Sequence, residues 1–92
     1  MLQARLTITG LVQGVGYRDW AMMRAQRLGL TGWVRNRSDG SVELLVVGED
    51  TAVGQMIEAC RQGPSMARIN EVDVEPMDLD VLPEGFRRLP TE

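Results

Sequence analysis

The chain has 92 residues, of which 43% are hydrophobic and 25% are charged, and its formal net charge is -3. This length predicts one small domain over residues 1–92, and the composition is typical of a soluble globular protein. No apolar run is long enough to span a membrane or to act as a signal peptide, so we expect a cytoplasmic protein, and a monomer at this size. The acidic total argues against general nucleic-acid binding, which depends on neutralising phosphates.

The residue types that most often bind zinc or carry out redox reactions are almost absent from this chain. Histidine is absent and Cys60 is the single cysteine, which excludes an internal disulfide and leaves a zinc or redox site with almost no ligands. Cys60 lies on an apolar helical stripe, so we interpret it as a core residue rather than a nucleophile. We therefore expect neither a metal nor another cofactor.

The first predicted elements are a strand and a helix. Apolar and polar residues alternate over residues 4–9, which predicts a half-buried strand with Ala4, Leu6 and Ile8 on its buried face. After a glycine-rich loop, apolar residues recur at helical spacing over residues 21–28, and Gly29 predicts the end of that helix.

A hairpin is predicted next. Two extended runs, residues 32–36 and 42–47, are joined by a segment that contains Asp39-Gly40. An Asp-Gly pair between such runs is a strong hairpin signal, so these two strands should be antiparallel neighbours.

The rest of the chain predicts a second helix and two further strands. The helix starts near Glu49 and ends before Gly63-Pro64, and its apolar stripe is formed by Val53, Met56, Ile57 and Cys60. A strand follows over residues 67–75, where a shift of apolar parity between Ile69 and Val72 indicates a bulge. Residues 85–90 predict a weak edge strand.

The order of elements predicts the fold. Strand, helix, two strands, helix and strand, with a short extra C-terminal strand, is the βαββαβ order of a ferredoxin-like α+β fold, an α/β sandwich with two helices on one face of an antiparallel sheet. This fold hosts many functions, so the function has to be argued from a site.

The segment from residue 10 to residue 18 has the character of an anion-binding loop. Three glycines, Gly10, Gly14 and Gly16, free the backbone to turn its N–H groups inward just before a helix N-terminus, where the helix dipole favours an anion. The dipole disfavours Arg18 at this place unless an anion is bound, when Arg18 can donate two hydrogen bonds to phosphate oxygens. The alternative is a tight turn with a solvated Arg18, since the loop is neither a P-loop nor a GxGxxG motif.

Asn36 is the second candidate. By strand alternation it shares a face with Val34, whereas Trp33 and Arg35 point the other way. Its side-chain amide either caps the following turn, as asparagine often does, or belongs to a site.

Taken together, the two segments resemble the acylphosphatase family. The signature Gly-x-Val-Gln-Gly-Val-x-Phe-Arg is matched with Tyr17 in the aromatic position, and Gly-Trp-Val-x-Asn with its following Asp-Gly-x-Val-Glu is matched as well. The matching residues are Gly10, Val12, Gln13, Gly14, Val15, Arg18, Gly32, Trp33, Val34, Asn36, Asp39, Gly40, Val42, Glu43 and Gly48. Further similar positions reach Gly85-Phe86, so the resemblance covers nearly the whole chain. Tyr17 brings a hydroxyl to the loop that needs a partner.

The resemblance implies an enzyme that hydrolyses the carboxyl–phosphate mixed anhydride of a small-molecule acyl phosphate to carboxylate and inorganic phosphate, by direct water attack and without a metal. Arg18 and Asn36 are the implied catalytic residues, Arg18 holding the phosphoryl group and Asn36 positioning the water. The implied phosphate-binding residues, largely through backbone amides, are Gln13, Gly14, Val15, Gly16, Tyr17 and Arg18. We expect inorganic phosphate or other anions to bind. We expect no binding to nucleic acid or to a membrane.

Two other functions fit the same fold. One is a non-catalytic anion-binding or regulatory module, which would bind phosphate without turnover. The other is the comparable domain of larger hydrogenase-maturation proteins, for which we expect a second domain that we do not find here. RNA binding through the sheet needs exposed strand aromatics, and of four aromatic residues only Trp33 lies clearly in a predicted strand.

Overall fold

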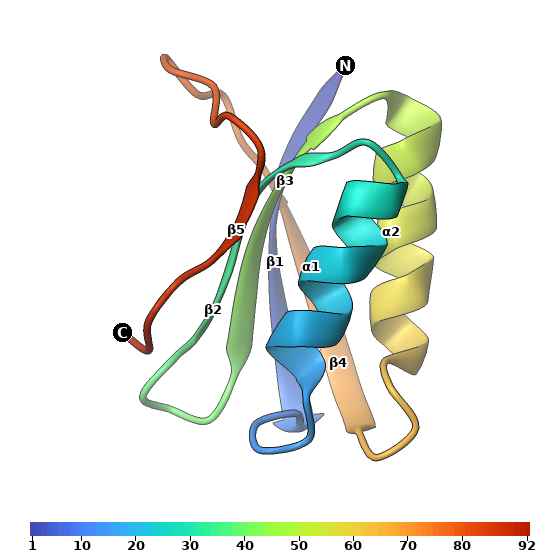
Figure 1. Cartoon of the computed structure of the whole chain (residues 1–92), viewed down its shortest axis with the longest axis vertical. Coiled ribbons are helices and arrows are strands. Elements are labelled where there is room, and N and C mark those ends of the chain that lie inside the picture. The colour runs from blue at the N-terminus through green and yellow to red at the C-terminus, as the bar shows by residue number, and fades with distance from the viewer.

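The computed structural model describes all of residues 1–92 and consists of two helices packed on a five-stranded sheet (Figure 1). The elements are β1 (Leu2–Leu11), α1 (Tyr17–Arg27), β2 (Thr31–Asn36), β3 (Val42–Gly48), α2 (Asp50–Gln62), β4 (Arg68–Pro76) and β5 (Phe86–Arg88). Both helices lie on the same face of the sheet, and the strand order is β4-β1-β3-β2-β5. The predicted ferredoxin-like α+β fold is confirmed.

The last strand makes the sheet mixed rather than wholly antiparallel. β1, β2, β3 and β4 pair antiparallel with their neighbours, whereas β5 pairs parallel with β2. The reason is chain direction: β4 ends at the end of the sheet where β2 begins, so a strand that starts there runs in the same direction as β2.

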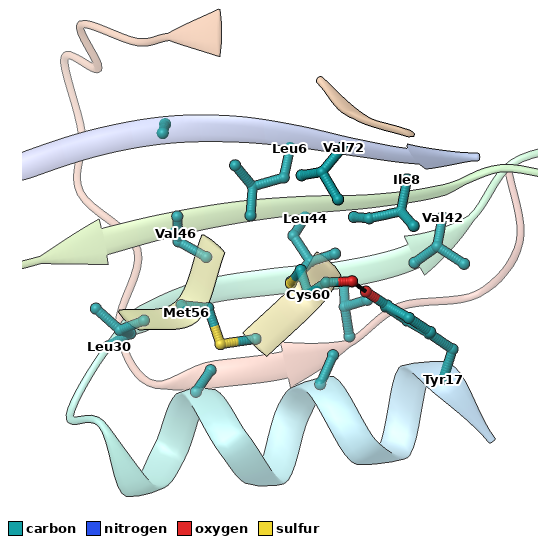
Figure 2. Close-up of a cluster of buried hydrophobic side chains, with 14 of the residues drawn as sticks. Leu6, Ile8, Tyr17, Leu30, Val42, Leu44, Val46, Met56, Cys60 and Val72 are labelled. Carbon is teal, nitrogen blue, oxygen red and sulfur yellow. Dashed lines mark hydrogen bonds between the residues drawn. The ribbon is translucent and has the colours of Figure 1, made fainter. Parts of the chain in front are cut away.

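The core fills the space between the helices and one face of the sheet (Figure 2). The alternation predicted for the first strand is confirmed, because Ala4, Leu6 and Ile8 are at most 6% exposed. α1 contributes Tyr17, Ala21 and Ala25 to this core, and α2 contributes Val53, Met56 and Cys60. Small residues on α1 let the helix lie close to the sheet.

The predicted bulge lies at the end of β1, just before the glycine-rich loop. Thr9 pairs with Glu71 and Gly10 pairs with Ile69, so Asn70 is the extra residue of β4. Gly10 has a φ of 123°, and a Cβ there would lie 2.1 Å from the carbonyl oxygen of Arg68. Glycine is therefore required where the bulge bends the strand pair and the chain turns toward α1.

Three segments that are distant in sequence meet at one end of the molecule. The loop after β1, the turn between β2 and β3, and the C-terminus all lie at the bottom of Figure 1. The backbone N–H of Ser38 in that turn donates to the main-chain oxygen of Glu92 at 2.9 Å. Neither helix combines the length and the apolar character that a membrane crossing needs.

Candidate active site

The loop before α1 presents a row of free backbone amides. Gly14 and Gly16 have φ values of 75° and 79°, in the left-handed region that favours glycine. Gly16 is the N-cap of α1 and provides no side-chain cap. The N–H groups of residues 13–19 donate to no backbone carbonyl. They are donors for an anion, at the positive end of the helix dipole.

Gln13 fixes this loop to the neighbouring hairpin. Its Nε2 donates to the carbonyl oxygens of Arg37 at 2.7 Å and Ser41 at 2.8 Å. The Gln13 side chain is thus engaged away from the free amides. What it contributes is the position of the loop relative to the β2–β3 turn.

A pocket of about 180 Å³ opens over the loop and the first turn of α1, with room for a phosphoryl group and water. Of the residues predicted to bind phosphate, Gly14, Gly16, Tyr17 and Arg18 line it, whereas Gln13 and Val15 do not. Both residues predicted to be catalytic belong to its lining, Arg18 from α1 and Asn36 from β2. The remaining lining residues are Val12, Asp19 and Arg88.

The C-terminal segment orients Arg18. Its Nη1 donates to the carbonyl oxygen of Leu89 at 3.2 Å, and Arg18 is half-buried. That single bond leaves other guanidinium N–H groups free, because an arginine has five donors. Arg18 is therefore tethered and still able to bind an oxyanion.

Asn36 is held by its backbone and its side chain remains available. It ends β2, and its carbonyl oxygen accepts a hydrogen bond from the N–H of Glu92 at 3.0 Å. The following turn is stabilised by Asp39, whose Oδ1 accepts from the Oγ of Ser41 at 2.6 Å and from its N–H at 2.9 Å. These two bonds, the side-chain one first, lower the pKa of Asp39. The Asn36 side chain makes no hydrogen bond to this turn, so the structure gives no support to the alternative in which Asn36 caps it.

The side chains of Tyr17 and Cys60 are buried in the core, although Tyr17 also belongs to the pocket lining. The Tyr17 side chain is 1% exposed, and its hydroxyl donates to the carbonyl oxygen of Cys60 at 2.8 Å, the dashed line in Figure 2. Burial raises the pKa of Tyr17 far above its ordinary value, and burial raises the pKa of the Cys60 thiol to about 11. Cys60 is thus a protonated core residue, as predicted, and not a nucleophile.

Asp19 and Arg88 are the charged lining residues that the sequence did not reveal. Arg88 comes from β5, where it pairs with Val34 and so points to the helix face of the sheet. Its Nη1 is paired with Oδ1 of Asp19. Alternation divides the residues of a strand between two faces, but it does not say which face is turned toward the helices. For Arg88 that depends on the strand with which β5 pairs, and so short a segment does not reveal its partner.

Comparisons with known proteins agree with this architecture. The family model described as acylphosphatase matches residues 4–88. An acylphosphatase of Rhizobium etli is 49% identical over 83 residues, which make up 90% of this chain and 88% of that protein. The crystal structure of acylphosphatase from Bacillus subtilis has a TM-score of 0.91 and 36% identity, and the match covers 97% of this chain and 99% of that one.

A second structural match comes from a much longer protein. Full-length HypF, crystallised in a phosphate- and nucleotide-bound form, matches with a TM-score of 0.87 and 30% identity over 99% of this chain, but over only 12% of its own. By contrast, the Rhizobium and Bacillus acylphosphatases are matched over almost their whole length. The predicted resemblance is confirmed: the chain belongs to the acylphosphatase family and is a hydrolase that acts on a small-molecule acyl phosphate.

Proposed function

We propose that this acylphosphatase hydrolyses the carboxyl–phosphate anhydride by direct attack of water on phosphorus, with Arg18 and the loop amides holding the phosphoryl group and Asn36 positioning the water. One observation carries the proposal. Arg18 and Asn36 line one pocket together with the loop before α1, whose backbone amides have no backbone acceptor.

The phosphoryl group is bound by fixed donors. The amides of residues 14–18 and the Arg18 guanidinium can donate to its oxygens, and the N-terminus of α1 adds favourable dipole charge. Donors that are already oriented also stabilise the charge that develops on these oxygens in the transition state, without reorganising at that moment. Gln13 supports this indirectly, because its side chain anchors the loop.

The water is positioned rather than deprotonated by Asn36. A side-chain amide both donates and accepts hydrogen bonds, but it is too weakly basic to take a proton, so the substrate's own phosphate oxygen is the acceptor. The departing carboxylate is a good leaving group and needs no acid. Positioning and charge stabilisation are then sufficient for the reaction.

We also propose that residues 1–92 act as a single domain and a monomer in the cytoplasm, and that inorganic phosphate binds as product. The single-domain proposal is supported by one shared core of both helices and the sheet. The single cysteine, which is free and buried, fits a reducing compartment.

The test is hydrolysis of benzoyl phosphate in the presence of a chelator, beside p-nitrophenyl phosphate as a monoester. We expect chelator-resistant cleavage of the acyl phosphate only. Arg18→Ala should lower kcat/KM about 100-fold or more and abolish competitive inhibition by phosphate, because it removes the charged donor. Asn36→Ala should lower kcat about 100-fold and leave the inhibition constant of phosphate nearly unchanged.

Two matched variants serve as controls. Arg24→Ala removes an exposed arginine of the same helix that stacks on Trp20, and Asn70→Ala removes the other asparagine, in the exposed bulge. Both should retain activity. Full activity in Asn36→Ala would show that the water is positioned otherwise, and phosphate binding without turnover in the unmodified chain would identify an anion-binding module.

A further inference from the structure

An acidic residue, Asp19, lines the pocket that is proposed to bind an anion. Asp19 is in the first turn of α1 and lines the pocket together with Arg18. Its sign suits the helix N-terminus, but it opposes a phosphoryl group. The Asp19 side chain is 60% exposed, so solvent and salt weaken its repulsion of an anion but do not remove it within a Debye length, roughly 8 Å at physiological ionic strength.

Arg88 is the cation that faces this carboxylate. Its Nη1 is paired with Oδ1 of Asp19, and Arg88 lines the same pocket. The pairing depends on the parallel register of β5 with β2, which puts Arg88 opposite Val34 on the helix face. The adjacent Arg87 is opposite Trp33 and points to the other face, away from the pocket.

We propose that Arg88 is a positioning residue that acts through Asp19: by pairing with the carboxylate it cancels a negative charge inside the pocket, so that Arg18 and the loop amides present a net positive site to the phosphoryl anion. Without Arg88 the charges of Arg18 and Asp19 would offset each other. The inference rests on the proposed function, because it takes this pocket as the phosphate site.

Charge compensation differs in its consequences from two other roles of the same pair. If the pair merely fastened β5 to α1, loss of either partner would weaken phosphate binding equally. If Arg88 itself contacted the anion, its loss could not be repaired by neutralising Asp19. Under compensation, neutralising Asp19 is harmless or beneficial, and it restores a chain that lacks Arg88.

The experiment is a titration of the full chain with inorganic phosphate at constant ionic strength, followed by ¹H–¹⁵N NMR shifts of Gly14 and Gly16. The spectra report on binding in inactive variants and verify that each one is folded. We expect Arg88→Ala to raise the Kd about five- to tenfold, the size of one unit charge acting on a phosphate dianion across a small pocket at the dielectric constant of water. Asp19→Asn should bind as tightly as the unmodified chain or more tightly, and Asp19→Asn with Arg88→Ala should return to within about twofold of it.

Arg87→Ala is the matched control and should leave the Kd unchanged. Arg88→Gln keeps most of the aliphatic stem and should raise the Kd as Arg88→Ala does. It replaces Arg88→Ala if the alanine variant fails to fold. Added salt should narrow the difference between Arg88→Ala and the unmodified chain.

Each contrary outcome has a separate meaning. Weakened binding in Asp19→Asn, or a double variant as weak as Arg88→Ala, would overturn charge compensation in favour of fastening or direct contact. An unchanged Kd in Arg88→Ala would overturn it outright. Arg18→Ala in the same titration separates the two proposals. If Arg18→Ala binds phosphate as tightly as the unmodified chain, the phosphate site itself is rejected. If Arg18→Ala binds more weakly while Arg88→Ala leaves the Kd unchanged, only the role of Arg88 is rejected.

Discussion

Tyr17 serves the pocket and the core at the same time. It is the first residue of α1 and lines the pocket, while its ring is buried between the sheet and α2. Its hydroxyl donates to the carbonyl oxygen of Cys60, so the start of α1 is tied to the last turns of α2 (Figure 2). The hydroxyl that the aromatic position adds therefore stabilises the scaffold under the loop.

Tyr17→Phe should consequently lower stability and leave catalysis intact. The substitution leaves a buried carbonyl oxygen without its donor, which costs about 1–2 kcal/mol, equivalent to a fall of roughly 4–8 °C in Tm per kcal/mol for a domain of this size. Thermal unfolding measures the first effect, and kcat with the phosphate inhibition constant measures the second. A large loss of kcat at unchanged Tm would mean that the hydroxyl reaches the pocket.

At the residue level, the sequence predicted several of the residues that line the pocket, but it did not predict the hydrogen-bond partners of their side chains. Arg18 and Asn36 could be predicted because their motifs are long and mixed in residue type. The bonds of the Gln13 side chain could not, because its acceptors are backbone carbonyls in a distant turn. Arg88 was missed because its face depends on the partner of β5.

Among the elements, the strands β1, β2 and β3 are joined across the helix-free face by one buried carboxylate. Glu43 on β3 has a side chain that is only 5% exposed. It pairs with Nε of Arg35 at 2.8 Å, Nη1 of Arg37 at 3.0 Å and Nη1 of Arg5 at 3.4 Å. Each of the three arginines belongs to β1 or to β2 and its turn, so the carboxylate links neighbouring strands.

This cluster predicts a particular acid sensitivity. Burial on its own raises the pKa of Glu43, but hydrogen bonds from Arg35 and Arg37, with their charges, outweigh it and lower the pKa. A carboxyl whose pKa is lower in the folded state stabilises the fold above its unfolded pKa of about 4.3, and the contribution is lost as pH falls through the folded pKa.

Glu43→Gln should therefore unfold more easily at about pH 7, by about 1–3 kcal/mol, and should lose less additional stability on acidification to about pH 3 than the unmodified chain does. Tm measured at both pH values gives the comparison. Glu58→Gln is the control, because that side chain is 72% exposed in a local pair with Arg61 and contributes little. An acid response in Glu43→Gln as steep as the original would exclude Glu43 as its source.

The helices and strands could be predicted from local sequence patterns, whereas the direction of the edge strand β5 could not. The hairpin turn, the two amphipathic helices and the bulge near Asn70 each have a signal within a few residues. The parallel pairing of β5 is set by where β4 ends and by which edge of the sheet is free. That information is distributed over the whole topology, so the mixed character of the sheet emerged only from the structure.

At the scale of the whole molecule, the single core makes Cys60 a reporter of unfolding. The residue is 0% exposed, and burial raises the pKa of its thiol to about 11. A thiol reagent attacks the thiolate and needs access, so labelling at neutral pH requires the chain to open. Cys60 is in the last turn of α2, where its backbone carbonyl accepts from Tyr17 and its side chain belongs to the core, so fraying of the chain termini does not expose it.

Labelling of Cys60 should be more than about a thousandfold slower in the native chain than in concentrated urea, given the ordinary stability of small domains. The rate should rise with denaturant along the slope of global unfolding. A rate that is insensitive to low denaturant would instead indicate local opening of α2.

The same labelling reaction connects the pocket to the stability of the entire fold. A ligand that binds only the folded chain lowers the open fraction by a factor of 1 + [L]/Kd, so inorganic phosphate at about 100 times its Kd should slow Cys60 labelling about 100-fold. Arg18→Ala should remove this protection while retaining slow labelling without phosphate, because Arg18 lies outside the core that covers Cys60. Equal protection in both chains would place the phosphate elsewhere, and protection in neither would mean that the free amides before α1 do not hold it.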